Sequence, residues 1–356
     1  MTCGVSWKPD RLSPKNAEPS VVMQNSDGPG QRPYWKFSLH NLGLTLATGF
    51  ILFFFSERLF WTVWRPGDSV GDLLITWLAY SSLAYVFLSV VSFFRVNEFG
   101  SLYLAGAIYG WLTEGALIYT LYGTEESAPF PVSVSITGLS WHALISVSVG
   151  WYATGLALTS VRPVRVAVIS VAVGIFWGVW ATFLWKESPP VITGVPEFLG
   201  FALGFTVLLA GAWWVSFRLG VTRFRPGWVG LLLCALILGV FFAQHVVRLG
   251  WRPLVVLPVI LSFALGPLMR HRRSVDNSGF GEFWGDFVPF HLIWFGLMPV
   301  TATVVYAAAK PLGLEAIPVT SIVYYWITGP AGFLLFVWAA IHCSRRRPRA
   351  QSFTQP

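Results

Sequence analysis

Charge is the first property that this sequence has little of. Asp, Glu, Lys and Arg supply 11% of its 356 residues, against about 25% in an ordinary soluble domain. Apolar residues supply 55%, and they include 29 phenylalanines and 19 tryptophans. A soluble globule needs more charge to cover its surface, so the composition excludes a cytosolic enzyme and a disordered protein. It predicts an all-α integral membrane protein without a soluble domain.

Cysteine is also scarce. The three cysteines are Cys3 in a polar stretch, Cys234 inside an apolar run and Cys343 at the end of another. No pair has the short spacing of a metal site, and an odd count at these places gives no disulfide framework. The sequence therefore predicts neither a metal site nor a disulfide scaffold.

The signature motifs of soluble catalysis are missing as well. The sequence contains no Walker lysine loop, dinucleotide-binding glycine fingerprint, GxSxG elbow or HExxH pair. The net charge of +8 is spread in short groups between apolar runs, without the basic stripe of a nucleic-acid groove. We expect no nucleic-acid partner, and the sequence indicates no particular cofactor or oligomeric state.

What the sequence does contain is a series of apolar stretches near the roughly 20 residues that a membrane-spanning helix needs. Ten candidates are 38–57, 72–94, 99–122, 136–160, 165–185, 196–217, 227–248, 253–269, 288–309 and 318–342. The eighth is short and carries Pro253, Pro258 and Pro267, which predict a kinked or incomplete span. These stretches define a transmembrane domain over residues 37–343. Residues 1–36 are predicted to be a disordered tail and residues 344–356 a basic tail.

The lysines and arginines predict how this domain is oriented. With the N-terminus in the cytoplasm, ten spans put 18 of the 24 basic residues on the cytoplasmic side. Every cytoplasmic connector then holds at least one of them, as the positive-inside rule requires. The prediction is a multi-pass protein of the cell membrane with both termini in the cytoplasm.

Ionisable residues inside such spans are few, and they mark function by default. In the third span, Gly106, Gly110 and Glu114 recur every four residues and so share one helix face. Small residues in such a row let a neighbouring helix approach closely. Glu114 is therefore expected to face protein and not lipid.

The fourth span has a matching row, Gly138, His142, Ser146 and Gly150. The two spans are consecutive and antiparallel, and Glu114 and His142 fall at similar depths below the outer surface. We therefore predict a contact between them. Such a pair can fix helix packing, relay a proton or bind substrate, or take part in metal or covalent chemistry.

A second polar group closes the seventh span, where Gln244, His245 and Arg248 lie within one turn. It is either an interfacial cap, with Arg248 reaching to the surface, or part of an outward-facing site in which Arg248 holds an anion. Glu57 and Arg58, at the end of the first span, are interpreted as ordinary interfacial charges.

Three functions fit these features. The first is a transporter or permease of a small or amphipathic solute, with a Glu/His site in the outer leaflet. The second is an intramembrane enzyme that acts on a lipid or isoprenoid, with Glu114 as general acid or base. The third is a redox subunit, in which His142 and His245 are the axial ligands of one haem, or a purely structural subunit. The expected partners are the lipid bilayer and a small-molecule or lipid substrate.

Overall fold

The regular secondary structure of the described residues is entirely helical. A computed structural model of the chain describes residues 38–65, 67–123, 128–186, 190–275, 284–314 and 317–346. These residues contain no β-strand, and their helices belong to one compact unit, Trp35–Pro356. The predicted tail 1–36, and residues 347–356 of the predicted tail 344–356, lie outside the described residues.

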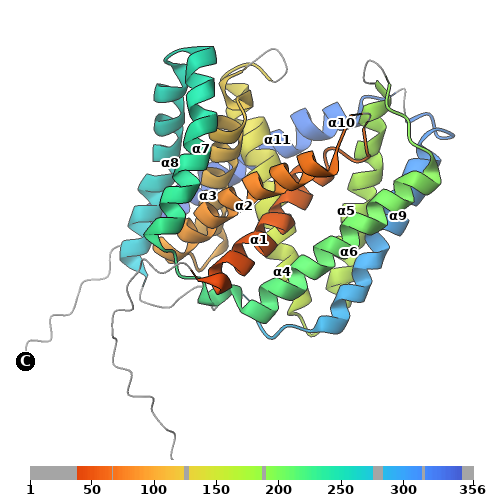
Figure 1. Ribbon diagram of the computed structural model, residues 1–356, viewed down its shortest axis with the longest axis horizontal. Coiled ribbons are helices and arrows are strands. Elements are labelled where there is room, and N and C mark those ends of the chain that lie inside the picture. Colours follow the sequence, from red (N-terminus) through yellow and green to blue (C-terminus); the bar gives the residue numbers. More distant parts are fainter. Residues whose placement is uncertain are drawn as a thin grey trace, which may run out of the picture. The chain divides into compact units, whose positions relative to one another are not determined.

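The described residues form ten longer helical segments, and the short 3₁₀ turns η3 (Thr120–Tyr122) and η6 (Val221–Arg223) lie in the connections between them (Figure 1). In chain order they are α1 and η1 (Leu39–Phe53 and Phe54–Arg58), α2 (Val70–Phe93), α3 and η2 (Phe99–Leu112 and Thr113–Leu117), η4 and α4 (Val134–Ala153 and Thr154–Leu158), α5 and η5 (Val164–Ala181 and Thr182–Lys186), α6 (Val195–Leu219), α7 (Trp228–Leu249), α8 (Arg252–Ser274), η8 and α9 (Pro289–Gly296 and Leu297–Ala309), and α10, η10 and α11 (Val319–Ser321, Ile322–Thr328 and Gly329–Arg345). Each overlaps one of the apolar stretches of the sequence.

Helix α8 differs most from its predicted form. It was expected to be short, but it continues as one helix of 23 residues through Pro258 and Pro267 to Ser274. Pro253 at its first turn lacks only an N–H that would have had no partner inside the helix. The helix is therefore as long as its neighbours and brings His271 to its last turn.

Eight of the helical segments are long and apolar enough to cross a membrane. They differ in how much of their surface the protein covers. In the most apolar part of Leu39–Arg58, 67% of the residues are buried, whereas in α7 the share is 17%. Exposed leucines and valines cover much of α7, and such a surface is stable in lipid but not in water. These features are those of a helical, multi-pass membrane protein.

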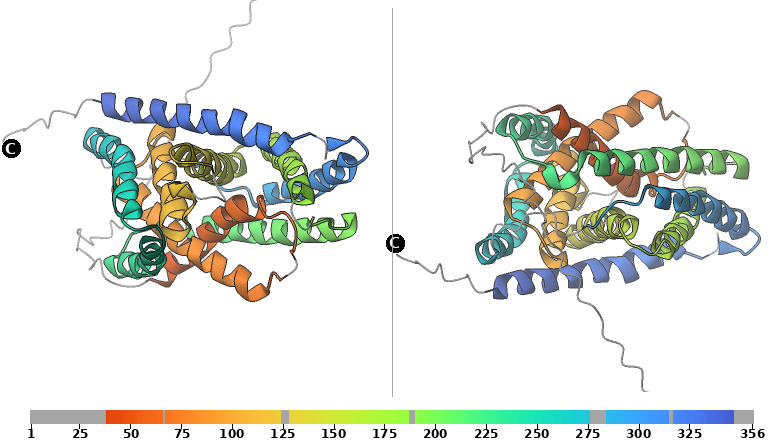
Figure 2. Two further views of the ribbon diagram at one scale, coloured as in Figure 1. Left: turned by 90° about the horizontal axis from the view of Figure 1, so that it is seen from above. Right: turned by 90° about the horizontal axis from the view of Figure 1, so that it is seen from below.

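The two segments outside that set are residues 99–117 and 134–158. They carry Glu114 and His142, and most of their side chains are buried inside the unit. Helix α3 packs against η4, α8 and α11, and Figure 2 shows α11 running along one side of these helices. The least apolar helices thus lie in the protein interior, where neighbouring helices cover their polar groups.

The contact between α3 and η4 depends on two glycines. A β-carbon at Gly110 would overlap the carbonyl oxygen of Gly138 and would lie 2.9 Å from the β-carbon of His142. One at Gly138 would lie 2.9 Å from the indole nitrogen of Trp111. The two backbones therefore meet at a point where only glycine fits, as the rows of small residues predict.

Four of the segments, η1, η2, η4 and η10, are wound more widely than an α-helix, with the i→i+5 pattern of a π-helix. Side chains follow the same pattern in η4, where the Ser148 hydroxyl donates to the carbonyl oxygen of Ala143 at 2.8 Å. Wide turns of this kind are uncommon and often occur at functional sites. All four contribute side chains to one cavity.

Candidate functional site

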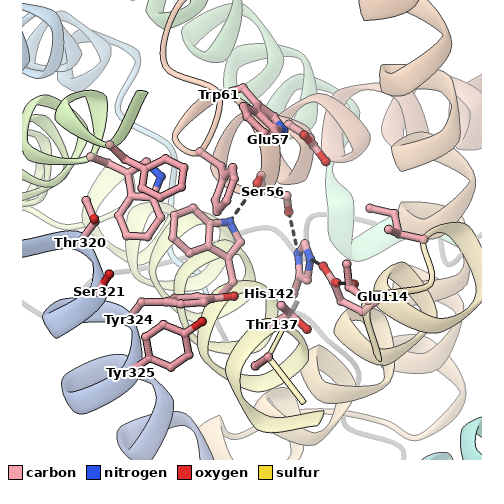
Figure 3. Close-up of a pocket in the computed structure, with 17 residues that line it drawn as sticks. Ser56, Glu57, Trp61, Glu114, Thr137, His142, Thr320, Ser321, Tyr324 and Tyr325 are labelled. Atoms are coloured by element: carbon pink, nitrogen blue, oxygen red, sulfur yellow. Dashed lines mark hydrogen bonds and ion pairs between the residues drawn. The ribbon is translucent and has the colours of Figure 1, made fainter. Parts of the chain in front are cut away.

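The cavity has a volume of about 510 Å³, and Figure 3 shows the side chains that line it. Its walls come from the ends of η1 and α5, from η2, from the first half of η4, and from α10 and η10. The lining residues are Ser56, Glu57, Phe60, Trp61, Glu114, Ile118, Thr120, Ala128, Thr137, Trp141, His142, Trp180, Phe183, Thr320, Ser321, Tyr324 and Tyr325. A cavity of this size holds a small organic molecule.

Glu114 and His142 meet in the wall of this cavity, as the sequence pattern predicts. The Nε2 atom of His142 lies 2.6 Å from Oε1 of Glu114, and both side chains are almost fully buried. The other oxygen of Glu114 accepts a short hydrogen bond from the hydroxyl of Thr120. Both oxygens of the Glu114 carboxyl group therefore have a partner, and one of these partners, the imidazole of His142, can carry a proton.

Ser56 extends this pair into a network. Its Oγ atom lies 3.1 Å from Nδ1 of His142 and 3.1 Å from the hydroxyl of Tyr109, and it donates to Ser146 at 2.9 Å. The imidazole thus lies between a carboxyl and a hydroxyl group, so a proton can occupy either ring nitrogen. A proton leaving Glu114 has a hydrogen-bonded route through His142 to Ser56.

Glu57 is the second carboxyl group of the cavity, and its interpretation as an ordinary interfacial charge is wrong. Its Oε1 atom accepts a hydrogen bond of 2.7 Å from the hydroxyl of Tyr80, and its side chain lines the cavity. Arg58 differs from its prediction too. It is 4% exposed, and its guanidinium group lies over the rings of Phe53 and Phe205, at 5.0 and 5.6 Å. The wide turn η1 thus buries Arg58 and directs the partly exposed Glu57 into the cavity.

Aromatic rings form much of the remaining wall. Trp141 packs against Phe60, Trp180 and Tyr324, with centroids 5.0, 4.7 and 6.0 Å apart, and its indole nitrogen donates to the carbonyl oxygen of Ser56 at 2.9 Å. Figure 3 shows Tyr324 and Tyr325 on the opposite side of His142 from Glu114. The cavity therefore combines apolar faces with two carboxyl groups and one imidazole.

The polar group at the end of α7 lies elsewhere. His245 packs on the ring of Tyr119, with centroids 5.6 Å apart, and the guanidinium carbon of Arg248 lies 4.3 Å from the same ring. Gln244 and Arg248 are exposed, His245 is buried, and none of the three is among the lining residues of the cavity. The structure thus unites Glu114 with His142 but not with Gln244, His245 or Arg248.

The geometry also bears on the haem hypothesis. Both ring nitrogens of His142 are engaged, one with Glu114 and one with Ser56, and His245 does not share its cavity. An axial ligand needs a nitrogen lone pair directed at the iron. These two histidines therefore do not form such a ligand pair.

Ser56, Glu57 and the tyrosines of η10 are the site residues that sequence reasoning missed. A clue was present at the first span, where a serine, a glutamate and an arginine follow each other in its last turn. Their place beside His142 depends on how the first helix packs on the fourth, which no short-range spacing encodes. In comparisons with known proteins, no family model, curated sequence or solved structure matches this chain.

Proposed function

We propose that the chain is a proton-coupled transporter of the cell membrane, and that its cavity binds a small amphipathic solute, preferably an organic cation. The observation that carries the proposal is the 2.6 Å Glu114–His142 contact in the wall of a solute-sized cavity. A carboxyl group and an imidazole in hydrogen-bonding contact can pass a proton between them.

The charges of the cavity support a cationic solute. Its described lining residues include two glutamates and one histidine, and neither lysine nor arginine. The rings of Trp141 and Trp180 also attract a cation through their ring electrons. A protonated amine with an apolar body fits these walls, and protonation of the carboxyl groups would release it. Because the solute and the protons compete for the same carboxyl groups, the protein would exchange one for the other.

The proposal includes ten membrane crossings, with both termini in the cytoplasm. Helix α3 supports the count, because Glu98 before it contacts His342 near the end of α11, whereas Glu114 near its end lines the cavity. Residues 134–158 connect the same two ends: Thr137 lines the cavity, and the carbonyl oxygen of Leu158 accepts from the backbone of Val288, before η8. Both helices therefore run as far as their apolar neighbours.

The test uses ethidium, a fluorescent aromatic cation, and vesicles that contain the purified protein and trapped DNA. An acidic interior should drive ethidium uptake above the rate of protein-free vesicles. Glu114→Gln should abolish the dependence on the pH gradient. Asp68→Asn is the control, since Asp68 pairs with Arg65 and is not among the lining residues. If Glu114→Gln took up ethidium under the pH gradient at the wild-type rate, Glu114 would have no role in proton coupling.

One observation favours a second function, an intramembrane hydrolase or acyltransferase that acts on a lipid. Ser56, His142 and Glu114 form a chain of hydroxyl, imidazole and carboxyl groups, the order in which a serine nucleophile is activated. In this reaction the Ser56 hydroxyl turns from Ser146 to His142, which accepts its proton as Ser56 Oγ attacks an ester carbonyl. His142 then gives this proton to the departing alcohol as the ester C–O bond breaks, and water or a second alcohol takes the acyl group from Ser56. Ser56→Ala should then abolish turnover of a lipid ester. A transporter should keep gradient-driven uptake in the same variant at a reduced rate.

A further inference from the structure

A second group of ligand-type side chains lies where α3, α8 and α11 meet, away from the cavity. Helices α3, α8 and α11 pack against one another. Glu98 is the N-cap residue of α3, His271 lies in the last turn of α8, and His342 and Cys343 lie in the last turn of α11. None of these residues lines the cavity, so the group requires its own explanation.

Three of these residues are close enough to share one ion. A carboxylate oxygen of Glu98, a ring nitrogen of His271 and the sulfur of Cys343 all lie within 4.8 Å of one another. Nδ1 of His271 is 3.4 Å from Oε1 of Glu98. The other carboxylate oxygen, Oε2, contacts Nε2 of His342 at 3.2 Å and pairs with Arg346. The carboxylate thus directs one oxygen to His271 and Cys343 and the other to the basic side chains.

The side of the group that faces His271 is buried and lacks hydrogen bonds. His271 and Cys343 are both 0% exposed. Neither Nδ1 of His271 nor Oε1 of Glu98 has a hydrogen-bond partner, although the two atoms are 3.4 Å apart. A buried polar atom without a partner is unfavourable. Two such atoms facing each other indicate that a cation belongs between them.

The second nitrogen of His271 determines which atom is free to bind. Its Nε2 lies 3.3 Å from the carbonyl oxygen of Arg95 and donates its hydrogen there. Nδ1 then presents its lone pair to Glu98 and Cys343. A histidine that ligates a metal commonly donates its other N–H to a backbone carbonyl in this way.

We propose that Glu98, His271 and Cys343 bind one Zn²⁺ ion, with water or His342 in the fourth position. A carboxylate, an imidazole and a thiolate are the ligand types that zinc takes, in tetrahedral geometry. The thiol proton of Cys343 passes to solvent when the ion binds. The ion would join the ends of three helices, which is a structural role separate from the proposed transport. The sequence predicted no metal site, because these ligands are far apart in the chain.

The test uses full-length protein without a polyhistidine tag, stripped with a chelator and titrated with Co²⁺ as a spectroscopic substitute for Zn²⁺. The wild type should bind one Co²⁺ per chain, with tetrahedral absorption bands and a thiolate-to-cobalt band. Zn²⁺ should displace it. Cys343→Ser should lose the thiolate band and bind at least about 100-fold more weakly. Cys234→Ser, a change at another buried free cysteine, should bind as the wild type does.

Two further variants keep the test decisive if Cys343→Ser does not fold. Glu98→Gln keeps the side-chain shape and should weaken Co²⁺ binding at least about 10-fold. His142→Gln, in the cavity, should leave binding unchanged. Wild-type protein without the thiolate band, or equal binding by wild type and Cys343→Ser, would overturn the proposal and leave Glu98–His271 as a protonated ion pair. Because no transport is measured, this result is independent of the transport assay.

Discussion

Two buried histidines of the described residues, His142 and His271, each lie against a glutamate, and the two pairs differ in geometry and surroundings. Glu114 and His142 are 2.6 Å apart, and both ring nitrogens of the histidine have partners. Glu98 and His271 are 3.4 Å apart, without a hydrogen bond between them, and a buried thiol lies beside them. The pair itself therefore does not determine a function. The partner of the second ring nitrogen and the third side chain do.

The surroundings of the two pairs also differ. Glu114 and His142 line a cavity, where a solute can compete with a proton. Glu98 and His271 lie among packed helix ends, where an ion would be held and not exchanged. Helix α3 connects them, with Glu98 before its first turn and Glu114 in η2. If both proposals hold, the first pair belongs to a site for exchange and the second to a site for structure.

The largest expected effect comes from breaking the first pair. His142→Leu leaves the Glu114 carboxyl buried without its imidazole, and loss of one partner of a buried pair destabilises by about 3–5 kcal/mol. Unfolding in mixed micelles with increasing dodecyl sulfate measures the change. The double variant with Glu114→Leu should regain part of the loss, because it leaves no buried charge. A double variant less stable than His142→Leu would contradict a pairwise interaction.

The next effect concerns the approach of α3 to η4. Gly110→Ala forces a β-carbon against Gly138, and overpacking of this kind costs about 1–3 kcal/mol. Gly204→Ala on α6 is the matched control, because a β-carbon there meets nothing within 4 Å. Its better helix propensity should stabilise the protein by up to about 1 kcal/mol. Equal effects of the two substitutions would show that the close approach has no consequence.

A smaller effect is expected at the centre of the cavity network. Ser56→Ala removes a hydroxyl that contacts Tyr109, His142 and Ser146, at a cost of about 1–2 kcal/mol. The gradient dependence of ethidium uptake should weaken while some uptake remains. Complete loss of lipid-ester turnover in the same variant would favour the enzyme over the transporter.

The smallest effect is expected at the edge of the second pair. His342 contacts the same carboxylate as His271, but its side chain is 41% exposed. His342→Leu should therefore change the unfolding free energy by less than about 1 kcal/mol. If His342→Leu lowered the unfolding free energy as much as His142→Leu does, the exposure of a histidine would not determine how much its contact with a glutamate stabilises the protein.

Sequence reasoning succeeded where a pattern runs along one helix or between neighbours in the chain. The ten helical segments follow from apolar length, and the Glu114–His142 contact follows from two rows of small residues on consecutive helices. It failed for Ser56 and Glu57, which reach the same cavity from a helix much earlier in the chain. It also grouped His245 with this site by depth alone, although His245 packs on Tyr119 outside the cavity. Depth is encoded in sequence distance, whereas the order of helix packing is not.

The low apolarity of residues 99–117 and 134–158 has a consequence for biogenesis. A helix that carries a glutamate or histidine in its interior partitions poorly from the translocation machinery into lipid. The segments that hold the central pair are thus the least able to enter the bilayer alone. Their insertion should depend on the more apolar α1 and α2, which are synthesised first and already offer a protein surface. Truncation before α3 should leave two stable spans, whereas residues 99–158 expressed without α1 and α2 should fail to insert.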